Sequence, residues 1–296
     1  MQLLHPFSKK VVHLPPFTKL PYAFGTQTDE NGVLSYQFGR IMNEHISDWS
    51  PNNARDLLLF KAITSSNPDP DSSHSPIVII INMENSRRSL SYRRPGKDVY
   101  WSRVPGFHLN YDDFTFYKGD FYVLDCNGEV GIVKGLDGDG SSPFISPLSL
   151  REYDDTLEAG EESLYNLVAT STDLLKVIRD YNDWVDEDSE SYGTTKGFRV
   201  FKLDFSCTKA PKWVVTKNIG DCALFLGTNN SFSVVPSDFP GCRCNCIYFT
   251  SHDVETLDYS GHDKGIFSLD DCMIEGVCPI DCKTICPRPL WYSTNP

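Results

Sequence analysis

The residues best suited to chemistry in this sequence are the thiols near its C-terminal end. Eight of the ten cysteines lie between Cys222 and Cys286. They include two regularly spaced runs, Cys242, Cys244 and Cys246, and then Cys278, Cys282 and Cys286. Four thiolates bind Zn²⁺ strongly, usually as pairs of cysteines separated by two residues. That pair spacing is absent and Cys246 begins an apolar strand, so we predict free or buried thiols, with a zinc site as the alternative.

Histidines and carboxylates, the usual general acids and bases, show no catalytic spacing. The seven histidines are scattered, and none belongs to a His-Glu-x-x-His motif. His252-Asp253 and His262-Asp263 fall in one predicted loop, where solvated side chains are expected. The run from Asp137 to Gly140 resembles the start of a Ca²⁺ loop but lacks its closing glutamate. We predict no catalytic residue, no metal and no cofactor, with a hydrolase that uses two of the many carboxylates as the alternative.

One compact basic patch stands out in an otherwise acidic chain. Arg93, Arg94 and Lys97 surround a Pro-Gly turn, and Trp101 follows shortly afterwards. Arginine and tryptophan are typical anchors of protein interfaces. We predict that Arg93, Arg94, Lys97 and Trp101 bind an acidic segment of a partner protein. The alternative is that this patch is a solvated hairpin tip.

Negative charge is concentrated in the segment 180–193 (DYNDWVDEDSESYG), which carries six carboxylates. Such a run usually projects into solvent, so we predict an acidic loop insertion here. The whole chain has 27 Lys and Arg against 40 Asp and Glu, a formal net charge of −13. This acidity argues against a general nucleic-acid binder and against binding to an anionic membrane surface.

The sequence carries no targeting signal that we can recognise. The N-terminus lacks the basic start, apolar run and small-residue cleavage site of a signal peptide. The densest apolar run, Ile77–Ile81, is far shorter than the stretch of about 18 apolar residues that a membrane span needs. We therefore expect a soluble protein of the cytoplasm, the nucleus or both.

The elements that must position these residues read as β-strands. Phe114–Val133 holds three aromatic or β-branched segments separated by turn signals, the second of them Asn127-Gly128, and this order predicts a β-meander. Both parities of Phe121–Leu124 are apolar, which predicts that both faces of the sheet are covered. Ala54–Ile63 fits either a helix turn or a buried strand. Further strands are predicted at Ile77–Asn82, Ser89–Arg93, Val99–Val104, Leu164–Thr170, Leu174–Arg179, Gly197–Asp204, Lys212–Lys217, Ala223–Gly227, Phe232–Val235, Cys246–Thr250 and Gly265–Asp270.

Short strands at this spacing predict an all-β fold, either a sandwich, a barrel or a propeller. The strands are too many for one small sandwich, and units of about 40–50 residues fit the blades of a β-propeller. At about 45 residues per blade, the 296 residues predict a single propeller of about six blades.

Several stretches, taken together, resemble one known family. They are RDLLLFKAITSSNP (55–68), YRRPGKDVYWSRV (92–104), FYKGDFYVLDCNGEV (116–130), GFRVFKLD (197–204), KWVVTKNIGDCALFLGTNNSFSV (212–234), DFPGCRCNCIYFT (238–250) and KGIFSLDD (264–271). In this order and spacing they are similar to the plant F-box-associated, KIB-type β-propellers, long labelled a domain of unknown function. The resemblance covers nearly the whole chain.

The resemblance implies a β-propeller that recognises substrates. In many family members an N-terminal F-box recruits a Skp-type adaptor, and the propeller presents a target protein for ubiquitination. Here Met1 stands almost directly on a hairpin ending in Leu14-Pro15, which lies inside the first blade region of the family. We therefore expect one propeller domain over 1–296 without an F-box, an N-terminal blade of fewer than four strands, and no direct recruitment of the adaptor.

The resulting functional prediction is a non-enzymatic protein-interaction module, similar to the substrate-recognition part of F-box ubiquitin ligases. Its partner is a target protein that the sequence does not identify. Two alternatives stay open. One is a propeller-scaffold hydrolase that uses carboxylates in the central channel, and the other is a truncated, inactive relative.

Overall fold

The structure is a computed structural model of the 296-residue chain. It describes residues 2–4, 11–39, 46–51, 54, 58–66, 76–84, 87–94, 97–106, 110–136, 142–149, 163–185, 191–206, 210–250 and 263–276. No helix in these ranges is long and apolar enough to cross a membrane.

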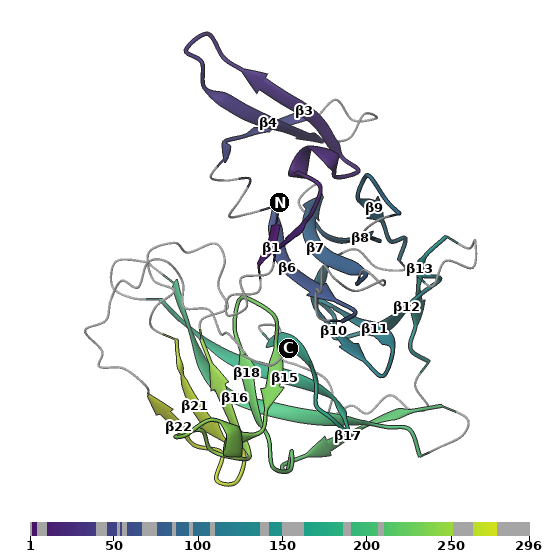
Figure 1. Ribbon diagram of the computed structural model, residues 1–296. Coiled ribbons are helices and arrows are strands. Elements are labelled where there is room, and N and C mark those ends of the chain that lie inside the picture. The colour runs from purple at the N-terminus through teal and green to yellow at the C-terminus, as the bar shows by residue number, and fades with distance from the viewer. Residues whose placement is uncertain are drawn as a thin grey trace.

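The described residues form six β-sheets (Figure 1). The two N-terminal sheets are β1 (Gln2–Leu4) with β2 (Val11–His13), and β3 (Ala23–Thr28), β4 (Leu34–Gly39) with β5 (Ile46–Trp49). Three four-stranded sheets follow in chain order: β6 (Leu59–Thr64), β7 (Val78–Glu84), β8 (Arg87–Arg93) and β9 (Ser102–Arg103); β10 (Tyr111–Tyr117), β11 (Asp120–Asp125), β12 (Val130–Lys134) and β13 (Phe144–Pro147); β14 (Ser163–Ala169), β15 (Leu174–Val185), β16 (Ser191–Asp204) and β17 (Lys212–Thr216). The last sheet has the spatial order β19 (Phe232–Val234), β18 (Ala223–Leu226), β20 (Cys246–Phe249), β21 (Gly265–Ser268) and β22 (Ile274–Gly276).

Neighbouring strands are antiparallel, apart from the parallel pair β18 and β20. Two short 3₁₀ helices complete the described structure, η1 (Phe17–Lys19) and η4 (Pro236–Asp238). The all-β fold class is confirmed, and the ambiguous segment 54–63 supplies strand β6. In the described part of the chain the two N-terminal sheets hold two and three strands. Residues 5–10, 40–45 and 277–296 lie outside the described residues, so an N-terminal blade of fewer than four strands stays a prediction.

The acidic segment predicted as a loop over 180–193 is for the most part a β-hairpin. β15 continues to Val185 and β16 begins at Ser191, with register pairs such as Tyr181 opposite Thr195. Aromatic, β-branched and threonine residues alternate with the carboxylates here, and such residues favour strands. At the base of the extension, Arg199 Nη2 lies 2.8 Å from Asp180 Oδ1 on the neighbouring strand. The described parts of the segment, 180–185 and 191–193, therefore extend a sheet, whereas 186–190, with four of the six carboxylates, lie outside the described residues.

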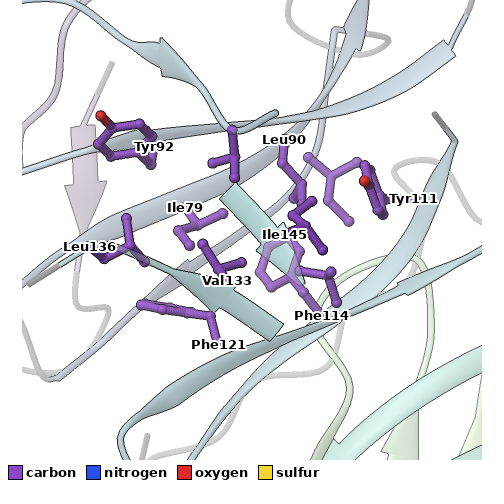
Figure 2. Close-up of a cluster of buried hydrophobic side chains, with 12 residues drawn as sticks. Ile79, Leu90, Tyr92, Tyr111, Phe114, Phe121, Val133, Leu136 and Ile145 are labelled. Atoms are coloured by element: carbon purple, nitrogen blue, oxygen red, sulfur yellow. The ribbon is translucent and has the colours of Figure 1, made fainter. Parts of the chain in front are cut away.

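Four apolar clusters hold consecutive sheets together. Each cluster draws its side chains from two neighbouring sheets, so the sheets pack face to face in chain order. Figure 2 shows the cluster between the β6–β9 and β10–β13 sheets, in which Ile79 and Leu90 point toward Phe114, Phe121 and Val133. This serial face-to-face packing of small sheets is the arrangement of propeller blades.

Strict alternation along single strands builds these clusters. In β11, Phe121 and Val123 enter the cluster shared with the β6–β9 sheet, whereas Tyr122 and Leu124 enter the cluster shared with the β14–β17 sheet. Successive side chains of a strand point to opposite faces, so a strand that is apolar at both parities serves two clusters. The prediction that both faces of this strand are covered is confirmed.

A buried carboxylate joins four of the sheets. Asp113 of β10 is fully buried and lies 2.9 Å from Lys61 Nζ of β6. Its Oδ2 atom accepts hydrogen bonds from the Leu167 amide of β14 at 3.0 Å and from Ser231 Oγ, beside β19, at 2.8 Å. Asn166 Nδ2 donates to both Asp113 Oδ2 and Ser231 Oγ. We call Lys61, Asp113, Asn166 and Ser231 the central polar cluster.

The strands that meet at this cluster are the terminal strands of their sheets. β6, β10, β14 and β19 each stand at one end of a sheet order. In a propeller these are the positions of the innermost strands around the axis. Two further hydrogen bonds hold the same region together, from Asn230 Nδ2 to the Ala62 carbonyl and from Ser233 Oγ to the Ala169 carbonyl.

Two other cations are buried between sheets. Arg179 of β15 donates to Thr195 Oγ1, to the Thr250 carbonyl and, at 2.5 Å, to Asp263 Oδ2, so all three of its nitrogens are used. Lys176, on the same strand, is 4% exposed and lies over the Trp213 ring, with its Nζ 3.3 Å from the Gly128 carbonyl. Burial lowers the pKa of Lys176 from 10.5 to about 8, against the opposing effect of the Asp125 charge.

Lys176 should therefore make stability depend on pH in the alkaline range. Between about pH 8 and pH 10.5 the unfolded chain keeps the Lys176 proton that the folded chain has lost, so the free energy of unfolding gains a contribution that rises with pH. Relative to Lys176→Met, the wild type should gain about 2 kcal/mol between neutral pH and about pH 10. Urea unfolding of both proteins at several pH values measures this difference, and a difference that does not change with pH would contradict the assignment.

Replacing Asp113 by asparagine should strongly destabilise the fold. The new amide nitrogen would face the ammonium group of Lys61, donor against donor, and would leave a buried charge without its counter-ion. Breaking a buried pair in this way costs about 3 kcal/mol or more of unfolding free energy. Chemical denaturation of Asp113→Asn measures this cost.

The neighbouring Asp112→Asn is the matched control. Asp112 is paired with Arg88 at 2.9 Å, and burial raises the pKa of its carboxyl. The Arg88 side chain is itself 27% exposed, so water can solvate it when the carboxylate is removed. The neutral amide at position 112 should therefore cost about 1 kcal/mol or less. Equal losses for the two variants would show that the central polar cluster has no special role.

Candidate interaction site

The predicted basic patch lies in the loop between β8 and β9, which closes on itself through Asp98. The Arg94 amide and Nε donate to Asp98 Oδ2 at 2.7 and 3.0 Å, and Arg94 Nη2 donates to Oδ1 at 3.2 Å. Burial alone would raise the pKa of Asp98, but the hydrogen bonds and charge of Arg94 bring it below its usual value. The charge of Arg94 is thus largely neutralised within the loop.

Arg93 ties this loop to the N-terminal segment. Its Nε donates to the Asp98 carbonyl at 3.2 Å and its Nη1 donates to the His13 carbonyl at 3.3 Å. Both acceptors are neutral backbone groups, so the positive charge of Arg93 persists at this place. Lys97 is exposed at the turn. Partner binding by Arg93, Arg94 and Lys97 stays a prediction.

Trp101, the predicted aromatic anchor, points into the core. It is 2% exposed and packs in the cluster that contains Val78 and Ile80. Its amide donates to the Lys19 carbonyl at 3.1 Å, and its indole Nε1 donates to the Pro15 carbonyl at 3.4 Å. In this structure the Trp101 ring is a packing residue that holds the N-terminal segment against the β6–β9 sheet, and it is not available to a partner.

The exposed aromatic residue is the one before it. Tyr100 is 57% exposed and Val99 is 70% exposed, and Lys19 Nζ stands 4.7 Å from the centre of the Tyr100 ring. We call Lys19, Lys97, Val99 and Tyr100 the basic loop surface. The sequence prediction chose Trp101 because tryptophan is the larger apolar group, but Tyr100 is the exposed residue of the two. Lys19 is distant in sequence, and no local signal links it to this loop.

A groove of about 350 Å³ lies between the β6–β9 and β10–β13 sheets. Ile77, Phe116 and Leu136 line it, and the Asp120–Lys134 ion pair, 2.9 Å long, stands among its lining residues. Val78, which follows Ile77, is the register partner of Arg93. The groove and the basic loop surface therefore lie at the same end of the β6–β9 sheet. An exposed tyrosine and two lysines suit an extended segment that carries acidic and apolar side chains.

Two of the interior carboxylates, Asp113 and Asp263, are bound by other residues of the chain. Both oxygens of Asp113 have partners, since Oδ1 pairs with Lys61 and Oδ2 accepts from Leu167 and Ser231. A general acid or nucleophile needs an oxygen that can reach substrate. Asp263, from one of the two predicted His-Asp pairs, is bound by Arg179 and Thr195. His252 and His262, and the run 137–140, lie outside the described residues.

The described cysteines are free thiols, and Cys246 and Cys222 lie in or against the core. Cys246 is 4% exposed, as predicted for a core residue, and Cys222 Sγ donates to the Ile219 carbonyl. Burial raises the pKa of Cys222 to about 11 and also raises the pKa of Cys242, which disfavours the thiolate form that binds metal. Within the described ranges, no three metal-ligating side chains come together. Cys278, Cys282 and Cys286 lie outside these ranges.

Comparison with known proteins places these features in a family. The family model described as the KIB1-4 beta-propeller matches residues 1–268. The F-box protein At2g26160 of Arabidopsis thaliana is 26% identical over 158 residues, which cover 51% of this chain and 43% of the relative. F-box protein At4g35733 of the same plant is 28% identical over 158 residues, covering 53% of this chain and 42% of the relative.

F-box protein SKIP23, also from Arabidopsis thaliana, is 23% identical over 303 aligned residues, covering 97% of this chain and 71% of the relative. For several others, the chain spans about half the length of the curated relatives it matches. The family model covers most of the chain, and the described residues form small sheets that pack against one another in chain order, as propeller blades do. The chain belongs to the KIB1-4 beta-propeller family.

Proposed function

We propose that this chain is the target-binding module of an F-box type ubiquitin ligase and has no enzymatic activity of its own. The observation that carries the proposal is the family match over residues 1–268, together with relatives that are named F-box proteins. In an F-box protein of this kind, the F-box recruits a Skp-type adaptor, and the propeller is the part available to bind the target. The proposal concerns target binding and places the protein in the cytoplasm or nucleus, where such ligases act.

The geometry supports a binding role. The apolar residues of the central strands pack between sheets, and the side chains of the central polar cluster bind one another. Chemistry directed at a partner must then come from loops and sheet ends. The basic loop surface offers an exposed aromatic ring together with two lysines. We propose that the target docks there through an acidic and apolar segment.

Tyr100→Ala should weaken target binding by about tenfold or more, because exposed aromatic residues at the centre of an interface often carry such a share of the affinity. Phe205→Ala is the matched control. Phe205 is also a largely exposed aromatic residue, but it follows β16 on another sheet. Tagged wild type and both variants would be expressed in plant cells, and co-purified proteins quantified by mass spectrometry.

The expected result is a defined set of proteins that the wild type and Phe205→Ala retain and Tyr100→Ala loses. Purified target and propeller should then bind directly, and the target should be ubiquitinated less when the propeller is depleted. A set of partners that both variants retain equally would remove the basic loop surface from the proposal. The absence of any partner specific to the wild type would contradict the proposed function itself.

A further inference from the structure

The β3–β4 hairpin projects away from the other sheets and has two unlike faces (Figure 1). Leu34, Tyr36 and Phe38 alternate along β4 and share one face, which Trp49 of β5 joins as the register partner of Tyr36. The opposite face is polar. It carries Ser35, Gln37 and Gln27, with Gln37 Nε2 donating to Gln27 Oε1 at 2.6 Å.

The apolar face is covered at the base of the hairpin and open toward its tip. Phe38 is buried in the cluster shared with the β6–β9 sheet, and Tyr36 and Trp49 pack against that cluster. Further out, Leu34 is 39% exposed. The face that begins as part of the core thus continues beyond it without a cover in the described part of the chain. Such a continuation marks a surface that another element can cover.

The outer edge of β3 is open as well. β3 is the terminal strand of its sheet, and none of the described strands pairs with its outer side. The Asp29 amide donates to the Val33 carbonyl, and from there the antiparallel alternation turns the backbone groups of Thr26 and Thr28 outward. Exposed edges are normally protected by lysine, proline or a bulge. β3 (AFGTQT) has no charged residue or proline, and its one irregularity lies at the base, between Ala23 and Gly25.

The two charged residues of segment 20–39, which contains the hairpin, are both acidic. The tip carries Asp29 and Glu30, and residues 20–39 contain neither lysine nor arginine. A second copy of this chain would bring the same carboxylates and another net charge of −13, which disfavours self-association. A partner strand that carries lysine or arginine near the hairpin tip would meet complementary charge.

We propose that the edge of β3 accepts an extended segment of another protein, which adds a strand to this sheet. The segment alternates apolar side chains, which cover Leu34 and the face beyond Tyr36, with basic side chains, which reach Asp29 and Glu30. Main-chain hydrogen bonds to Thr26 and Thr28 provide the pairing, as in other cases of β-strand addition. This surface is separate from the basic loop surface and does not depend on the proposed function.

The test uses the full chain and two fluorescent peptides of equal length, one alternating valine with lysine and one alternating valine with glutamate. Fluorescence anisotropy should show binding of the valine–lysine peptide, at least about tenfold tighter than binding of the valine–glutamate peptide. Thr26→Pro removes an outward amide, and Leu34→Asn removes an exposed apolar group. Each should weaken binding of the valine–lysine peptide by about tenfold.

Ser35→Asn is the matched control, because it introduces the same side chain one residue away on the polar face, and it should change binding less than about twofold. Circular dichroism and thermal melting check that each variant is folded; Leu34 is an exposed side chain, so Leu34→Asn should fold even where Thr26→Pro does not. Tyr100→Ala should leave peptide binding unchanged, which separates this inference from the proposed function.

Three results would overturn the proposal. They are equal binding of the two peptides, equal loss with Leu34→Asn and Ser35→Asn, and a wild-type dimer in light scattering that Leu34→Asn dissociates. The last result would show that the occupant of the edge is a second copy of the chain. A monomer that prefers the basic peptide and loses it with Leu34→Asn supports the proposal.

Discussion

The fold depends on the placement of one buried carboxylate. Asp113 holds a buried ammonium group, a backbone amide and a hydroxyl that come from three other sheets. Burying a charge is costly unless it is paired and hydrogen-bonded, so these four sheets are stable together only in the one arrangement that satisfies it. The apolar clusters supply most of the favourable free energy, but they are tolerant of small shifts. The central polar cluster is directional, and it therefore selects the relative positions of the innermost strands.

This use of the interior determines where function can lie. Strands such as β11 give both of their faces to packing, and Lys176 and Arg179 bury their cations between sheets. To bind a ligand at the centre of the fold, the protein would need polar side chains that are not already bound to one another. In the described part of the chain such groups occur at sheet ends and edges, in the β8–β9 loop and on the β3–β4 hairpin. Both binding surfaces that we propose therefore lie at the periphery of the described structure.

The sequence predicted best where both parities of a short apolar run are flanked by turn signals, as in Phe121–Leu124, because the turns identify the run as a strand and its apolar residues then require cover on both sides. The sequence prediction was wrong where a shift of one residue decides which side chain is exposed. Trp101 lies in the core and Tyr100 outside, since a loop has no period that assigns its side chains to a face. Asp113 looked like its neighbour Asp112 because the partners that distinguish them are brought together only by the fold. β3 and β4 carry many polar residues and were not predicted as strands from alternation.

The two surfaces differ in how the charge of the chain acts on their partners. The screening length is about 8 Å at physiological ionic strength, so the net charge of −13 is felt only close to the protein. An acidic segment is attracted by Lys19 and Lys97 at short range but repelled by the acidic surface around them. Its binding therefore depends on contact with Tyr100. A basic segment approaching the β3–β4 hairpin is attracted by the carboxylates at its tip, and residues 20–39 hold no basic residue that opposes this attraction, which favours fast association. The excess of carboxylates thus restricts the basic loop surface to acidic segments that also contact Tyr100, whereas it favours any basic segment at the β3–β4 hairpin.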